Sequence, residues 1–171
     1  MVASVLLVAV LLVACWTDLR SRRIPNWLTV GGMLAGLAVR AAMGAGPVGT
    51  GVLGIALAAL LALPFFVLGA LGGGDAKLFM AVGAFMGPAD LAGASLVIAV
   101  VGGVVALFEA MRRGVLLPTL ASCGSLILGW VTLGRRGGAR TAATGDRLAV
   151  PYGVAIAVGS LLWWFAGGLA S

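Results

Sequence analysis

The segment from Val2 to Asn26, VASVLLVAVLLVACWTDLRSRRIPN, decides the fold class of this chain. Sixteen uncharged residues come first, and an aspartate, three arginines and a proline follow them. Sixteen helical residues span about 24 Å, slightly less than the hydrocarbon core of a bilayer. We therefore expect a first membrane helix over residues 2–18 that extends past Asp18. Because the basic cluster follows the apolar run, we expect this helix to stay attached rather than to be removed as a signal peptide.

The composition of the whole chain agrees with a membrane protein. Of its 171 residues, 62% are hydrophobic and only 9% are charged, which is too few polar side chains to cover a water-facing surface. The net charge of +6 is better explained by membrane topology and anionic lipid than by nucleic acid. The chain has no histidine and only two cysteines. Histidine-dependent catalysis and a zinc-thiolate site are therefore not expected, and we predict neither a metal nor a cofactor.

Apolar runs cut at charges and at Pro/Gly clusters predict an all-α, polytopic membrane protein of one domain over residues 1–171. Six transmembrane helices are expected at about residues 2–18, 26–43, 51–71, 75–86, 91–111 and 150–170. The remaining segment, 112–147, has an apolar centre between two arginine pairs, so crossing would place one pair on the wrong side. We expect it to be cytoplasmic, interfacial or re-entrant.

The positive-inside rule supports this plan. If the loop that holds Arg20 to Arg23 is cytoplasmic, the other basic residues also fall inside, except Arg40 near the outer end of the second helix. Asp18 then ends a helix that runs inward and Asp75 begins one that runs outward. Both carboxylates are expected near the cytoplasmic face of the membrane, at similar depth.

Two neighbouring carboxylates at membrane depth suggest chemistry, because ionisable groups there are costly. Such a pair cannot readily lose both protons, so one acid can act as a base on water while the other supplies a proton. The glycines Gly72 to Gly74 would let an extended substrate backbone approach closely. The helix dipole favours a charged Asp75 and a neutral Asp18, although Arg20 opposes the second effect. Coupled acids titrate as a pair, and the assignment of acid and base stays open.

Structural explanations exist for each of these features. Asp18 could pair with Arg22 or Arg23 at the membrane surface, and GGGD could be a turn with a helix cap. Lys77 either supports Asp75 or follows the positive-inside rule, and Asn26 and Tyr152 either bond near the site or only fix helix ends.

Three stretches resemble the type IV prepilin peptidase family, whose members are GxGD membrane aspartic peptidases. They are TDLRSRRIPNWLT (17–29), GGGDAKLFMAVGAFMG (72–87) and PYGVAIAVG (151–159). The resemblance implies a multi-pass protein of the bacterial cytoplasmic membrane that cleaves the basic leader of a prepilin after a glycine. It implies Asp18 and Asp75 as catalytic residues. Gly72, Gly74 and Lys77 match the GxGD-x-K element of the family, and we take them as candidates for a supporting role. The substrate partner would be the leader and first membrane helix of the prepilin.

The chain lacks the paired CxxC motifs and the cytoplasmic insertion of longer family members. It looks like the short, peptidase-only TadV/CpaA-like branch that serves Flp-type pili, for which no methyltransferase activity is expected. Two other classes stay open: a non-catalytic membrane subunit of a pilus or secretion assembly, and a small proton-coupled transporter.

Overall fold

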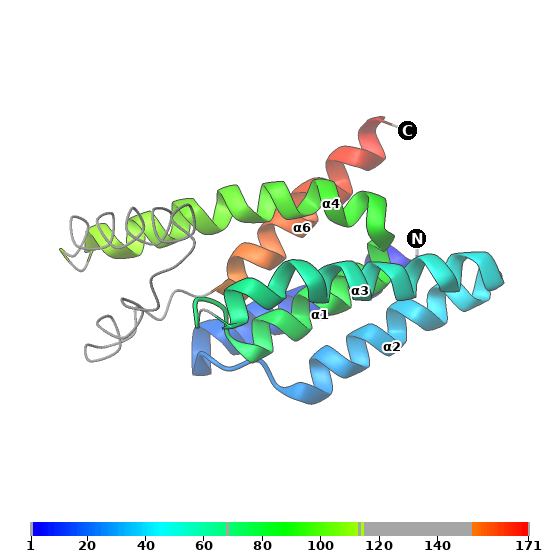
Figure 1. The fold of residues 1–171 in the computed structure, drawn as a ribbon, viewed down its shortest axis with the longest axis horizontal. Coiled ribbons are helices and arrows are strands. Elements are labelled where there is room, and N and C mark those ends of the chain that lie inside the picture. Colours follow the sequence, from blue (N-terminus) through cyan, green and yellow to red (C-terminus); the bar gives the residue numbers. More distant parts are fainter. Residues whose placement is uncertain (1, 68, 113, 115–151, 171) are drawn as a thin grey trace, which may run out of the picture. The chain divides into compact units, whose positions relative to one another are not determined.

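The computed structural model describes residues 2–67, 69–112, 114 and 152–170, and all regular structure in this part of the chain is helical. The chain divides into two compact units, residues 1–102 with 151–171, and residues 103–150. The elements (Figure 1) are α1 (Val2–Ser21), α2 (Asn26–Ala42), α3 (Ala45–Val67), α4 (Gly73–Arg112) and α6 (Tyr152–Ala170). The all-α prediction is confirmed. The segment predicted to be interfacial, 112–147, lies almost entirely outside the described residues.

The described helices expose many large apolar side chains, as the helices of a membrane protein do. Large apolar side chains such as Leu12, Leu60 and Val100 are more than half exposed, as suits contact with lipid. By length and composition, α1, α3 from Gly46 onward and α4 can each cross a membrane, whereas α2 and the apolar part of α6 are shorter. The chain is an all-helical membrane protein.

The link from α1 to α2 is fixed by backbone geometry. The amide of Arg22 donates to the Asp18 carbonyl at 2.8 Å, and Arg22 then adopts a left-handed φ of 50°, which ends the helix. Pro25 is extended and caps α2, whose first amide bonds run to the Pro25 carbonyl. The predicted start of this helix at Asn26 is confirmed.

Three predicted helix bounds are corrected. The third helix begins at Ala45 rather than at residue 51. Pro47 falls in its first turn, where backbone amides have no partner within the helix, so the amide hydrogen that proline lacks costs no helical hydrogen bond. It ends at Val67, where Gly69 takes a φ of 72° and the amides of Ala70 and Leu71 both bond to one carbonyl. The fourth helix begins at Gly73 rather than at residue 75.

The helices predicted at 75–86 and 91–111 form a single element, α4, with a break inside it. Gly87 adopts a φ of 76° and a ψ of 178°, a conformation open to glycine, and Pro88 follows it. The two halves, 73–86 and 88–112, therefore correspond to the two predicted helices, and one non-helical residue separates them.

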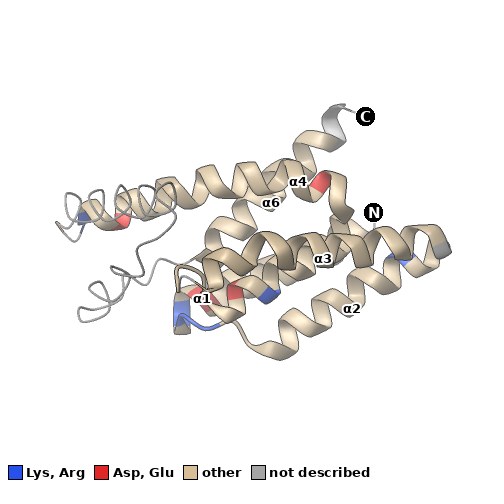
Figure 2. Ribbon diagram, viewed as in Figure 1, with Lys and Arg blue, Asp and Glu red and all other residues tan. Residues whose placement is uncertain are grey.

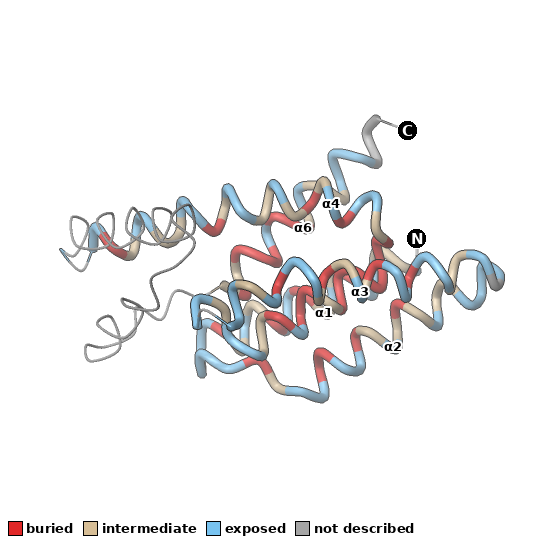
Figure 3. The backbone as a smooth tube through the Cα atoms, viewed as in Figure 1, coloured by how far each residue is buried: buried red, intermediate tan, exposed pale blue. Residues whose placement is uncertain are grey.

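Small residues bring the first half of α4 against its neighbours. A Cβ on Gly54 of α3 would collide with the Gly83 carbonyl of α4, and one on Gly36 of α2 would lie 2.9 Å from the Ala84 Cβ. The buried residues of this half-helix are drawn in red in Figure 3 and include every position from Ala81 to Met86. Close backbone approach of this kind is how membrane helices pack without a hydrophobic driving force.

Arg40, the exception to the positive-inside pattern, caps the break in α4. Its guanidinium donates to the Ala84 carbonyl at 3.0 Å, to the Phe85 carbonyl at 2.7 Å and to Thr50 Oγ1 at 2.6 Å. Pro88 has no amide to offer the Ala84 carbonyl, so the arginine takes the place of the missing helical bond.

Replacing Arg40 by methionine is expected to lower the free energy of unfolding by about 2–4 kcal/mol. Two carbonyls would lose their donor, and a buried unsatisfied group costs about 1–3 kcal/mol. Thermal unfolding in detergent measures the loss. Arg40→Lys keeps the charge but not the fork of donors and should fall between. A methionine variant as stable as the wild type would contradict the capping role.

Candidate active site

The charged residues of α1, of the loop after it and of the start of α4 gather at one end of the first unit, as Figure 2 shows. This end contains a cavity of about 300 Å³. Its lining comes from three segments that are distant in sequence, namely the end of α1, the loop that follows it and the start of α4. The lining residues are Asp18, Arg22, Arg23, Ile24, Gly72, Gly73, Gly74 and Asp75.

The two predicted acids open onto this one cavity. Asp18 lies three residues before the end of α1 and is only 6% exposed, whereas Asp75 lies in the first turn of α4 and is half-buried. The charge of Asp18 acts on Asp75, so the carboxylates are within electrostatic reach of each other. A pair of carboxylates that share a cavity can divide the roles of base and acid between them.

Each carboxylate is held by backbone amides. The Gly153 amide of α6 donates to Asp18 Oδ2 at 3.0 Å in a buried bond, and the Val154 amide is a second donor to this carboxylate. The Gly72 amide donates to Asp75. Backbone donors orient a carboxylate without adding a titratable group of their own.

Three glycines near the acids, Gly72, Gly74 and Gly153, leave little or no room for a larger residue. A Cβ on Gly72 would lie 2.8 Å from Asp75 Oδ2, and one on Gly153 would lie 2.7 Å from Asp18 Oδ2. A Cβ on Gly74 would lie 3.2 Å from the Ile24 Cβ. The predicted Gly72 and Gly74 therefore do line the cavity, with Gly73 between them.

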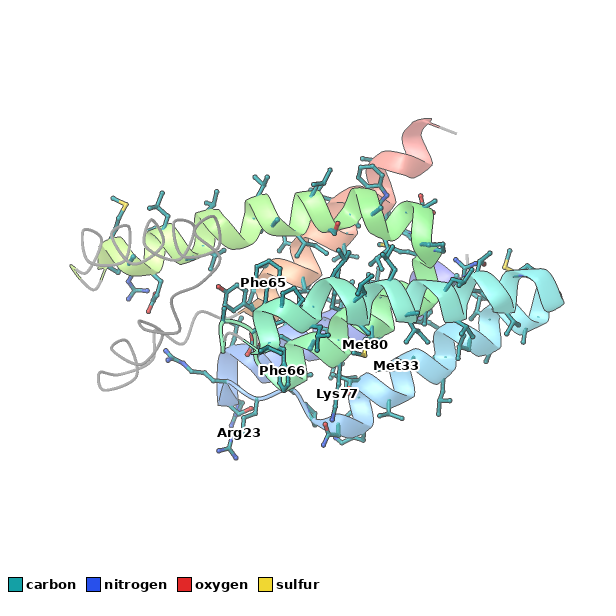
Figure 4. All side chains as sticks on the ribbon, in the orientation of Figure 1. Arg23, Met33, Phe65, Phe66, Lys77 and Met80 are labelled. Carbon is teal, nitrogen blue, oxygen red and sulfur yellow. The ribbon has the colours of Figure 1, made fainter. Side chains whose placement is uncertain are left out.

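The other predicted supporting residues lie elsewhere. The Lys77 ammonium donates to Asn26 Oδ1 at 2.9 Å, on an exposed surface; Figure 4 labels the lysine beside the start of α2. Neither residue lines the cavity. Lys77 is two positions from Asp75, or about 200° around a helix, so the two side chains leave opposite faces. Tyr152 is the half-buried first residue of α6 and precedes Gly153.

Four residues at the site were not among the predicted site residues. Arg22 and Arg23 line the cavity, and the other two are Ile24 and Gly153. Ile24 is buried at 9% exposure, against Gly74 and Gly153, and Gly153 holds Asp18. Both stand inside stretches that carried the family resemblance, IPN and PYG, which was the available signal for them.

Comparison with family models gives one match. Residues 5–107 fit the model of the type IV leader peptidase family, more than half of the 171 residues. The chain belongs to the type IV leader peptidase family. The matched region includes both aspartates and the three glycines of the cavity, and it ends before α6. Comparisons with curated proteins and with solved structures gave no match.

Both aspartates of this member of the leader peptidase family line one cavity. A cavity with two carboxylates and a glycine wall can admit water and a peptide backbone together. Ile24 fills the space next to Gly74 and Gly153. It therefore limits the size of a substrate side chain that can approach the acids.

Proposed function

We propose that this protein is a membrane aspartic endopeptidase that removes the basic leader from Flp-type type IV prepilins, after a glycine. The observation that carries the proposal is the shared cavity of about 300 Å³ onto which Asp18 and Asp75 both open. The family match supports the peptidase activity, and the absence of histidine from the sequence leaves carboxylates as the available acid–base pair.

In the proposed reaction, one carboxylate removes a proton from a water molecule, whose oxygen attacks the scissile carbonyl carbon. The protonated carboxyl of the other aspartate donates a proton as the C–N bond breaks and the amine leaves. One water is consumed, the base ends protonated and the acid ionised, and a proton transfer between them restores the starting pair. No methyltransferase step is part of the proposal.

The proposed topology has six crossings in the bacterial cytoplasmic membrane: α1, α2, α3, the two halves of α4, and α6. The cavity would then face the cytoplasm. The arginines after α1, which border the cavity, support this orientation through the positive-inside rule.

The test is cleavage by purified protein in detergent micelles. An Flp-type prepilin with its leader and first membrane helix is incubated with the protein, and mass spectrometry reads the new N-terminus. We expect cleavage after the glycine, none when that glycine is replaced by valine, and the same rate with a metal chelator present. Loss of cleavage in chelator would contradict the two-carboxylate mechanism. An uncut precursor under all conditions would favour a non-catalytic subunit of a pilus assembly.

Among the three cavity glycines, Gly72→Ala is expected to lower the cleavage rate by about tenfold to a hundredfold. The new methyl group would lie 2.8 Å from Asp75 Oδ2 and displace the carboxylate, and small misplacements of catalytic groups cost about this much. Gly73→Ala is the matched control, because its methyl group meets only Phe66 Cε2 at 3.6 Å. Equal rates for the two variants in the cleavage assay would contradict the assignment.

A further inference from the structure

The first turn of α6 reaches the active site through one backbone contact. The Gly153 amide donates to Asp18 Oδ2 across 135 positions of sequence. Gly153 does not line the cavity, so it does not touch a substrate placed there. Its role in the proposed reaction must run through Asp18.

Burial disfavours the charged form of both acids, but the groups that oppose this effect differ between them. Asp18 is 6% exposed, accepts bonds from two amides at the N-terminus of α6, and lies near the cation of Arg22. Asp75 accepts one amide bond, and the charge that acts on it is the negative charge of Asp18. A helix N-terminus and its free amides stabilise an anion.

We infer that the Gly153 amide is a positioning group that keeps Asp18 as the carboxylate anion, which makes Asp18 the base and Asp75 the acid. This rests on the proposed peptidase function. It reverses the bias expected from the helices that carry the acids, because that expectation placed no second helix N-terminus beside Asp18.

The decisive variant is Gly153→Ala. Its methyl group would lie 2.7 Å from Asp18 Oδ2 and 3.1 Å from Ile24 Cδ1, so the carboxylate must move off the amide. We expect kcat to fall about tenfold to a hundredfold, as for the loss of a hydrogen bond to a charged group, with KM unchanged. The acidic limb of the kcat profile should move to higher pH, because the base is then held less firmly as an anion.

The profile discriminates between the two assignments. If Asp18 were the acid, loss of the amide bond would move the alkaline limb instead, and the inference would be overturned. An equal fall at every pH would overturn it as well, since it would show a packing role alone. The titratable and charged groups around Asp18 that must be constant in this comparison are Cys15, Arg22, Arg23, Asp75 and Tyr152.

Two alanine variants of α6 are matched controls. Gly167→Ala adds a methyl group in open space and should change nothing. Gly159→Ala places its methyl group 2.7 Å from the Ile98 Cα; it should lower stability without moving either limb of the profile.

A second readout needs no peptidase activity. Infrared titration of the Asp75→Asn protein, with Asp18→Asn/Asp75→Asn subtracted, follows the ionisation of Asp18 directly. Addition of Gly153→Ala should move its midpoint to higher pH, and an unmoved midpoint would overturn the inference. If the wild type did not cut the precursor, the proposed function would be wrong. The titration would still test whether the Gly153 amide stabilises the Asp18 anion.

Discussion

Asp18→Asn and Asp75→Asn are each expected to lower the rate of prepilin cleavage about 10³-fold or more. General acid–base groups contribute about 10²–10⁴-fold each, and the two acids act as a unit around one water. The amide keeps the shape of the carboxylate, and in the Asp18 variant Oδ1 can still accept the Gly153 amide. The folded structure should therefore remain, and the rate alone should fall.

The measurement is the cleavage assay with equal amounts of folded protein, checked by thermal unfolding. Asp90→Asn is the matched control, because Asp90 is exposed and lies outside the cavity. The double variant should be no slower than either single one, as for residues that act together. Full activity of either single variant would refute the two-carboxylate mechanism.

Gly54→Ala is expected to give the largest loss of stability, about 3 kcal/mol or more. The new methyl group would collide with the Gly83 carbonyl oxygen and lie 2.9 Å from the Gly87 Cα. These are backbone atoms of the broken part of α4, so no side chain can rotate away and the helices must separate. Overpacking in a tight core typically costs about 1–3 kcal/mol, a large part of a total of about 5–15 kcal/mol.

The effect is read by thermal unfolding in detergent. The control on the same helix is Gly49→Ala, whose methyl group meets nothing within 4 Å. That variant should be neutral or stabilised, because alanine favours helix by up to about 1 kcal/mol over glycine. The same substitution should therefore lower the stability of the protein at Gly54 and leave it unchanged or raise it at Gly49. Equal changes would mean that α3 and α4 do not meet at Gly54 and Gly83.

The sequence predicted the helices well because apolar runs, charges and prolines mark the ends of membrane segments. Its errors have local causes. The third helix was expected from residue 51, yet the first turn of a helix tolerates proline, and α3 begins at Ala45, ahead of Pro47. Asp18 and Asp75 stood out as candidates because the chain has few acids and no histidine, and the structure places both on one cavity.

The contacts that complete the site could not be predicted in the same way. The bond from Gly153 to Asp18 joins residues 135 positions apart, and the partners of Arg40 are mostly backbone carbonyls that carry no side-chain signal. Lys77 is different, since its position on the helix opposite to Asp75 follows from spacing alone.

The half-helix that carries Asp75 is hydrogen-bonded to α2 near both of its ends. Asn26, the first residue of α2, accepts the bond from Lys77, and Arg40, in its last turn, holds the Ala84 and Phe85 carbonyls. Asp18 instead belongs to α1 and accepts a hydrogen bond from the Gly153 amide of α6. The two acids are thus anchored to different helices, and Ile24 packs against Gly74 on the side of Asp75 and against Gly153 on the side of Asp18.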